Sequence, residues 1–139
     1  MAGARDVILA LNEQVVKDVH VRFAYLFGSQ ALGKTTALSD IDIAVFLDNS
    51  VDPLHHRLKL IETFTRVTKN ESIDIVVLNQ ATPLLKHQVI RDGRVLKEAR
   101  EERLLFETAV LREYLDLEGL RKVQRSYIRE QIRAGTYFG

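Results

Sequence analysis

The chain has 139 residues, and its 46% hydrophobic content suffices for one ordinary core but not for two comfortable domains. No apolar run approaches the roughly 18 residues of a membrane span, and the N-terminal segment carries acidic residues where a signal peptide would be apolar. We therefore expect a cytoplasmic protein without membrane contact. With no cysteine and four scattered histidines, the chain excludes disulfides and zinc–thiolate sites, so any metal ion is expected on oxygen ligands.

Strand signals occur at four places along the chain. Residues 21–27 form a short run rich in β-branched and aromatic residues, and residues 41–47 and 73–79 are similar runs. Residues 94–97 are a brief fourth candidate. Helical segments separate these runs, which predicts one small sheet covered by helices.

Helix signals begin at residues 3–19, where Ile8, Leu11, Val15 and Val19 have helical spacing. Asp52 with Pro53, and Thr82 with Pro83, are typical helix starts, and Asp92 with Gly93 ends the second of these helices. Residues from Arg100 onward are expected to be helical, with a break at Gly119 and a last helix to about Ala134. The expected apolar faces are Leu54, Leu58, Ile61 and Phe64 in the second helix, and Leu104, Leu105, Leu111, Tyr114 and Leu115 after Arg100.

The C-terminal end is the basic part of the chain. Residues 119–139 carry five arginines and lysines against one glutamate, although the whole chain has a net charge of only +1. A basic helix of this kind is typical of a solvated surface, and contact with a partner or with RNA is the alternative.

One short stretch fits two motifs. Residues 28–35, GSQALGKT, match the phosphate-loop pattern G-x-x-x-x-G-K-[ST]. That loop must open a helix of several turns that crosses back to a parallel strand, which takes at least about 10 residues. Only four residues separate Thr35 from Asp40, so we interpret the match as coincidental.

The other motif is an Asp-x-Asp pair on a strand. Asp40 and Asp42 are two residues apart, so their side chains point to the same face. Asp74 lies on the third strand, and the three carboxylates converge if the second and third strands are neighbours. Carboxylates this close repel one another unless a hard cation lies between them. The sequence therefore predicts Mg²⁺ bound by Asp40, Asp42 and Asp74, where it would bridge a polyphosphate.

The Gly28–Ser29 pair is expected to hold the outer phosphates of a nucleotide. Glycine at the end of a strand permits close backbone approach, and a turn over residues 30–33 would offer amide donors beside the Ser29 hydroxyl. Lys34 faces either the phosphates or water. The three histidines on predicted helices, His55, His56 and His87, are expected to be surface or packing residues.

Residues 25–47, together with SIDIVVLN at 72–79, resemble the minimal nucleotidyltransferase family of the DNA polymerase β-like superfamily. The family signature is Gly-Ser, ten residues, Asp-x-Asp and a third acidic strand residue. Residues 89–99 are similar to the family's closing strand, and the helical tail is similar to that of the MntA antitoxins that pair with HepT toxins. This resemblance implies an α+β fold with a small mixed β-sheet backed by helices. It divides the chain into a nucleotidyltransferase core (1–99) and a helical C-terminal extension (100–139) that packs on the core and contacts a partner.

The resemblance also implies an activity. The expected reaction transfers AMP from ATP to a tyrosine of a HEPN-type ribonuclease toxin, with the catalytic and Mg²⁺-binding roles on Asp40, Asp42 and Asp74. The nucleotide-binding roles would then fall to Gly28, Ser29, Gln30 and Lys34. The sequence departs from the family at Gln30 and Leu32, where arginines are common, which removes positive charge near the phosphates.

Two other functions remain open at this level. The chain could be a non-catalytic antitoxin that neutralises its toxin by binding, or a nucleotidyltransferase that modifies a small-molecule hydroxyl such as an antibiotic. Intact Asp40, Asp42 and Asp74 favour an enzyme, because an unused cluster of like charges destabilises a fold. A hetero-oligomer with the toxin is expected, and no direct nucleic-acid role is predicted.

Overall fold

The computed structural model describes residues 4–28 and 40–133. Within them the strands form a four-stranded mixed sheet in the order β3-β2-β1-β4. β1 (Val21–Phe27) is antiparallel to both β2 (Ile41–Leu47) and β4 (Arg94–Lys97), whereas β2 is parallel to β3 (Ile73–Val77). The predicted α+β class with a small mixed sheet is confirmed.

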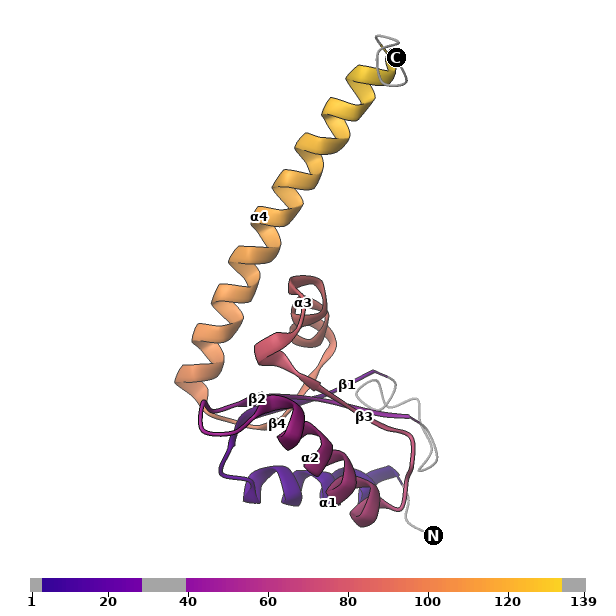
Figure 1. The fold of residues 1–139 in the computed structure, drawn as a ribbon, viewed down its shortest axis with the longest axis vertical. Coiled ribbons are helices and arrows are strands. Elements are labelled where there is room, and N and C mark those ends of the chain that lie inside the picture. The colour runs from indigo at the N-terminus through magenta and orange to yellow at the C-terminus, as the bar shows by residue number, and fades with distance from the viewer. Residues whose placement is uncertain (1–3, 29–39, 134–139) are drawn as a thin grey trace.

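Helices cover both faces of this sheet (Figure 1). α1 (Ala4–Lys17) and α2 (Pro53–Thr68) lie on one face, while α3 (Pro83–Asp92) and the first part of α4 (Arg100–Arg133) lie on the other. β1 and β2 therefore bury side chains in two separate hydrophobic clusters, one on each face of the sheet. The cluster beneath α1 and α2 contains Ile41, Ile43 and Val45, and the opposite cluster contains Ala44.

The two predicted helix starts are confirmed. The Asp52 side chain accepts a hydrogen bond from the backbone N–H of His55 at 3.1 Å, and the Thr82 hydroxyl accepts one from that of Leu85 at 3.2 Å. A proline follows each of these capping residues. Proline is suited to the first helical position because it has no N–H to leave unpaired. The third strand is shorter than predicted, because the 3₁₀ turn η2 (Leu78–Gln80) follows Val77.

The predicted apolar faces of two helices are confirmed only in part. In α2 the buried residues are His56, Leu60 and Phe64, whereas Leu54 and Leu58 are exposed. In α1 Leu11 and Val15 are buried as predicted and Val7 is buried as well, whereas Val19 follows the end of the helix and is exposed. Both helices carry more apolar residues than one face holds, so tertiary packing decides which of them are buried.

α4 is one continuous helix, so the predicted break at Gly119 is wrong. Glycine inside a helix costs about 1 kcal/mol relative to alanine, which weakens a helix without ending it. The predicted apolar face is also wrong for most of its members: Leu104, Leu105, Leu111 and Leu115 are exposed, while Val110 is buried.

The first turns of α4 are anchored to the sheet by polar contacts. Arg22 on β1 forms an ion pair with Glu102, and the Tyr25 hydroxyl donates to the Glu107 carboxylate at 2.7 Å. Burial, followed by the bond to Glu107, raises the pKa of Tyr25. From this base the helix, about 51 Å long at 1.5 Å per residue, projects well beyond the body (Figure 1). Within residues 4–28 and 40–133, none of the helices has the length and apolar character that a membrane crossing requires.

Candidate active site

Three carboxylates meet at one end of the sheet. Asp42 on β2 is the register partner of Asp74 on β3, and Asp40 lies two residues before Asp42. Neighbouring strands are about 4.8 Å apart, so the Asp42 and Asp74 side chains leave the sheet side by side. The neighbouring arrangement of these two strands, on which the sequence prediction depended, is confirmed.

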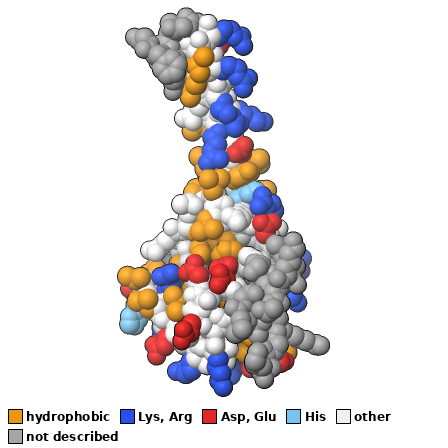
Figure 2. Space-filling view, turned by 90° about the vertical axis from the view of Figure 1, so that its right-hand side faces the viewer, with side chains coloured by type: hydrophobic (Ala, Val, Ile, Leu, Met, Phe, Trp, Pro, Cys, Tyr) orange, Lys and Arg blue, Asp and Glu red, His pale blue; other side chains and the backbone are white. Residues whose placement is uncertain are grey.

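The carboxylates of the cluster lie close enough to act on one another electrostatically. Burial raises the pKa of Asp42, and the negative charges of Asp74 and then Asp40 raise it further. Asp42 is half-buried, whereas Asp40 and Asp74 are exposed. The three carboxylates line an open pocket of ≈ 390 Å³ together with Ser72 and Ile73. Figure 2 shows acidic side chains gathered on one side of the body.

Gly28 lies directly beside this cluster. It follows Phe27, the register partner of Asp42 at the end of β1, and its φ of +74° lies in the left-handed region that disfavours residues with a side chain. A Cβ at this position would stand 2.4 Å from Oδ2 of Asp42. The glycine thus allows the backbone at the end of β1 to lie close against the half-buried carboxylate.

Arg57 is a site residue that the sequence analysis missed. From α2 it donates to the backbone carbonyl of Ile75 at 2.7 Å and to Oδ1 of Asp74 at 3.1 Å. An arginine on an amphipathic helix usually points to solvent, and its spacing from Asp74 along the chain carries no signal. Only the pairing of α2 with β3 brings the two residues together.

The donor chemistry fits a hard cation, because three adjacent carboxylates offer the oxygen ligands that Mg²⁺ prefers. Among residues 4–28 and 40–133, however, no three Asp, Glu, His or Cys side chains are grouped closely enough to hold a metal ion as they stand. Asp74 is paired with Arg57, with 3.1 Å between Nη2 and Oδ1. The predicted nucleotide-binding residues Ser29, Gln30 and Lys34 lie outside the described residues.

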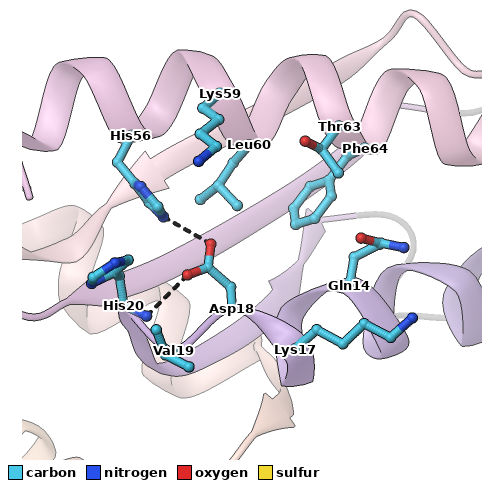
Figure 3. Close-up of a pocket in the computed structure, with 10 residues that line it drawn as sticks. All are labelled: Gln14, Lys17, Asp18, Val19, His20, His56, Lys59, Leu60, Thr63 and Phe64. Atoms are coloured by element: carbon cyan, nitrogen blue, oxygen red, sulfur yellow. Dashed lines mark hydrogen bonds and ion pairs between the residues drawn. The ribbon is translucent and has the colours of Figure 1, made fainter.

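A second pocket, of ≈ 300 Å³, lies between α1 and α2 on the opposite face of the sheet (Figure 3). Asp18 accepts hydrogen bonds there from the backbone N–H of His20 at 2.9 Å and pairs with Nε2 of His56 at 2.8 Å. His56 is therefore a buried packing residue. His55 is exposed, and His87 stacks on Tyr114 with 3.6 Å between ring centroids, so the prediction for all three histidines is confirmed.

Comparison with known proteins identifies related sequences and structures. The family model described as polymerase beta, nucleotidyltransferase matches residues 10–102. The protein adenylyltransferase MntA of Aphanizomenon flos-aquae is 31% identical, over 89% of this chain and 87% of the relative. The protein of the same name from Shewanella oneidensis is 28% identical, over 94% and 87%. A crystal structure of a toxin–antitoxin with AMP-PNP has a TM-score of 0.69 and 26% identity, and the match covers 89% of this chain and 97% of that chain.

Proposed function

This chain belongs to the polymerase β nucleotidyltransferase family, and we propose that it is an antitoxin that transfers AMP from ATP to a tyrosine of a HEPN-type toxin. The modification would inactivate the toxin. The observation that carries this proposal is the meeting of Gly28, Asp42 and Asp74 at one end of the sheet, with Asp40 alongside.

The comparisons support the substrates. Two relatives that match most of this chain are named protein adenylyltransferases, which indicates transfer of AMP to a protein. The similar toxin–antitoxin structure contains AMP-PNP, which is an ATP analogue. A toxin acceptor and ATP as donor are therefore the substrates we assign. ATP is abundant in the cytoplasm, where we propose that the protein acts.

The chemistry is an in-line displacement at the α-phosphorus of ATP. The tyrosine oxygen forms a bond to that phosphorus, the bond to the β-phosphate oxygen breaks, and pyrophosphate leaves. We assign the hydroxyl proton to Asp74, because it is on a different strand from the Asp40–Asp42 pair, and we propose that the tyrosine approaches from its side. General base assistance is typically worth about 10²–10⁴-fold in rate.

The remaining site residues hold the nucleotide. We propose that Asp40, Asp42 and Asp74 bind Mg²⁺, which when present would neutralise charge on the phosphates. Gly28 leaves room for the Asp42 carboxylate, and we propose that its backbone, together with Ser29, Gln30 and Lys34, donates hydrogen bonds to the phosphates. The raised pKa of Asp42 is consistent with a site built to receive positive charge.

The toxin needs a docking surface, and we propose that it lies on the distal segment of α4, residues 118–133. This part of α4 exposes apolar side chains at helical spacing, Leu120, Val123, Tyr127, Ile128 and Ile132. Beside them are Arg121, Lys122, Arg125, Arg129 and Arg133, against Glu118 and Glu130. An apolar toxin surface with an acidic rim matches both features, whereas a second copy aligned in parallel would bring like charges together.

The same surface also suits a non-catalytic antitoxin, which would neutralise the toxin by covering it. The two functions differ in their need for the carboxylates. Only the enzyme requires Asp40, Asp42 and Asp74. A binding antitoxin would have a more stable fold without the repulsion between these carboxylates.

Intact-mass spectrometry of the toxin after incubation with this protein, ATP and MgCl₂ is the direct test. We expect a mass increase of one or more AMP units, which fragmentation should locate on tyrosine. The Asp40→Asn, Asp42→Asn double variant should give no increase, whereas the matched control Asp116→Asn, an exposed carboxylate on α4, should act as wild type. An unmodified toxin that is nevertheless neutralised would favour the binding antitoxin. AMP on a small hydroxyl compound but never on the toxin would favour a small-molecule acceptor.

A further inference from the structure

Arg57 makes two contacts around the outer edge of the sheet. Its Nε donates to the Ile75 carbonyl at 2.7 Å, and its Nη2 donates to Oδ1 of Asp74 at 3.1 Å. We propose that Arg57 is a positioning residue, which fixes the Asp74 carboxylate in the orientation that AMP transfer requires. This inference rests on the proposed function, because it assumes that Asp74 takes part in the reaction.

The first contact follows from the position of β3 in the sheet. β3 is an edge strand, and Ser72 directs its carbonyl inward to the N–H of Ile41 at 2.8 Å. Successive carbonyls along a strand alternate in direction, so the Ile75 carbonyl, three residues later, points outward. Arg57 satisfies this carbonyl from α2, and the guanidinium is thereby fixed at the edge of the sheet.

The second contact joins opposite faces of the sheet. α2 covers the face to which Ile73 and Ile75 point, whereas Asp74 lies between them on β3 and therefore points to the other face. The guanidinium therefore passes around the edge of β3 to reach Asp74. Its planar, multi-donor geometry allows it to bind a carbonyl and a carboxylate at once, which the single ammonium of a lysine does less well.

The exposure of the pair argues for a positioning role and against a purely stabilising one. The side chains of Arg57 and Asp74 are 35% and 59% exposed, and ion pairs at this exposure contribute little to stability. The guanidinium nevertheless restricts the rotation of Asp74, whose free carboxylate would be repelled by Asp42. A carboxylate displaced by about 1 Å from a reacting group can reduce the rate about 10²-fold.

The test is a double-mutant cycle between Arg57 and Asp74, with kcat and ATP affinity measured separately. We expect Arg57→Ala to lower kcat roughly 10- to 100-fold while the Kd for ATP changes little. In the Asp74→Asn background the same substitution should change kcat less than about twofold, since the group it positions is gone. Arg66→Ala, an exposed arginine of the same helix, is the matched control and should act as wild type.

A measurement without nucleotide or metal completes the test. The ¹³C resonance of the Asp74 carboxylate should move in Arg57→Ala and remain in place in Arg66→Ala. If Arg57→Ala does not fold, Arg57→Lys serves instead, and we expect an intermediate loss of kcat. The positioning role would be overturned if Arg57→Ala lowered kcat equally in the wild type and in the Asp74→Asn variant. It would also be overturned if Arg57→Ala left the Asp74 carboxylate resonance in place. Absence of AMP transfer by the wild type would overturn the proposed function, and the resonance would still report on the contact.

Discussion

Gly28 and Asp42 are in direct apposition: a Cβ on Gly28 would lie 2.4 Å from Oδ2 of Asp42. The glycine has φ +74°, so a side chain there meets both backbone strain and a half-buried carboxylate. Gly28 therefore connects the end of β1 to the acidic cluster in a way that only glycine permits.

Substitution of Gly28 should impair nucleotide binding severely. We expect Gly28→Val to reduce ATP affinity by far more than one lost hydrogen bond, because it displaces Asp42 and blocks the approach of the phosphates. Isothermal titration with ATP and MgCl₂ measures this loss. Gly119→Ala is the control: a Cβ there meets nothing within 4 Å, so affinity should be unchanged and the free energy of unfolding should rise by about 0.5–1 kcal/mol. Wild-type affinity in Gly28→Val would place the phosphates elsewhere.

Asp42→Asn should abolish AMP transfer without destabilising the metal-free protein. The pKa of Asp42 is raised, so the folded state holds its proton more tightly than the unfolded state, and the ionised carboxylate weakens the fold as pH rises. The asparagine variant should therefore have the higher Tm at pH 7 in the presence of chelator. This advantage should shrink as the pH falls towards the ordinary value of 3.8, where the wild-type carboxyl is protonated. A Tm below that of the wild type at pH 7 would contradict the repulsion argument.

The strands and the acidic site could be predicted from the sequence because their signals are local. Three of the four strands have the predicted bounds, and the spacing of Asp40 and Asp42 alone places both on one face. Helix faces were harder to predict, because α1 and α2 carry more apolar residues than one face holds and packing selects which are buried. His56 illustrates this, since its burial depends on Asp18, 38 residues away in the chain. Arg57 could not be found for the same reason: its contacts depend on how α2 sits against β3.

The distal segment of α4 should be required for toxin binding and not for nucleotide binding. We expect Tyr127→Ser or Val123→Ser to weaken the toxin complex roughly 10-fold or more, since exposed apolar anchors dominate such interfaces. ATP affinity should stay as in the wild type. Leu105→Ser is the matched control, because Leu105 is equally exposed on α4 but lies outside the distal segment.

The basic residues of the same segment allow a second, independent test of the proposed docking surface. Arg125→Glu and Arg129→Glu together should slow association with the toxin and reduce its dependence on salt. Size-exclusion chromatography with light scattering of the protein alone completes the comparison. Self-association that is lost in Tyr127→Ser, with toxin binding intact, would assign this surface to a second copy instead.

Asp74→Asn should separate binding from catalysis. The variant keeps the size and hydrogen-bonding capacity of the side chain but loses the base, so we expect normal toxin binding, some ATP binding and transfer slowed by about 10²–10⁴-fold. Co-expression with the toxin is the decisive experiment, with cell growth and the mass of the toxin recorded together. If the protein neutralises the toxin by AMP transfer, the Asp74→Asn variant should fail to protect the cells. An unmodified toxin stays active even when it is bound transiently. Asp116→Asn should protect as the wild type does. Full protection by Asp74→Asn with no adenylylated tyrosine would overturn the enzymatic account, because only a surface that masks the toxin could then explain neutralisation.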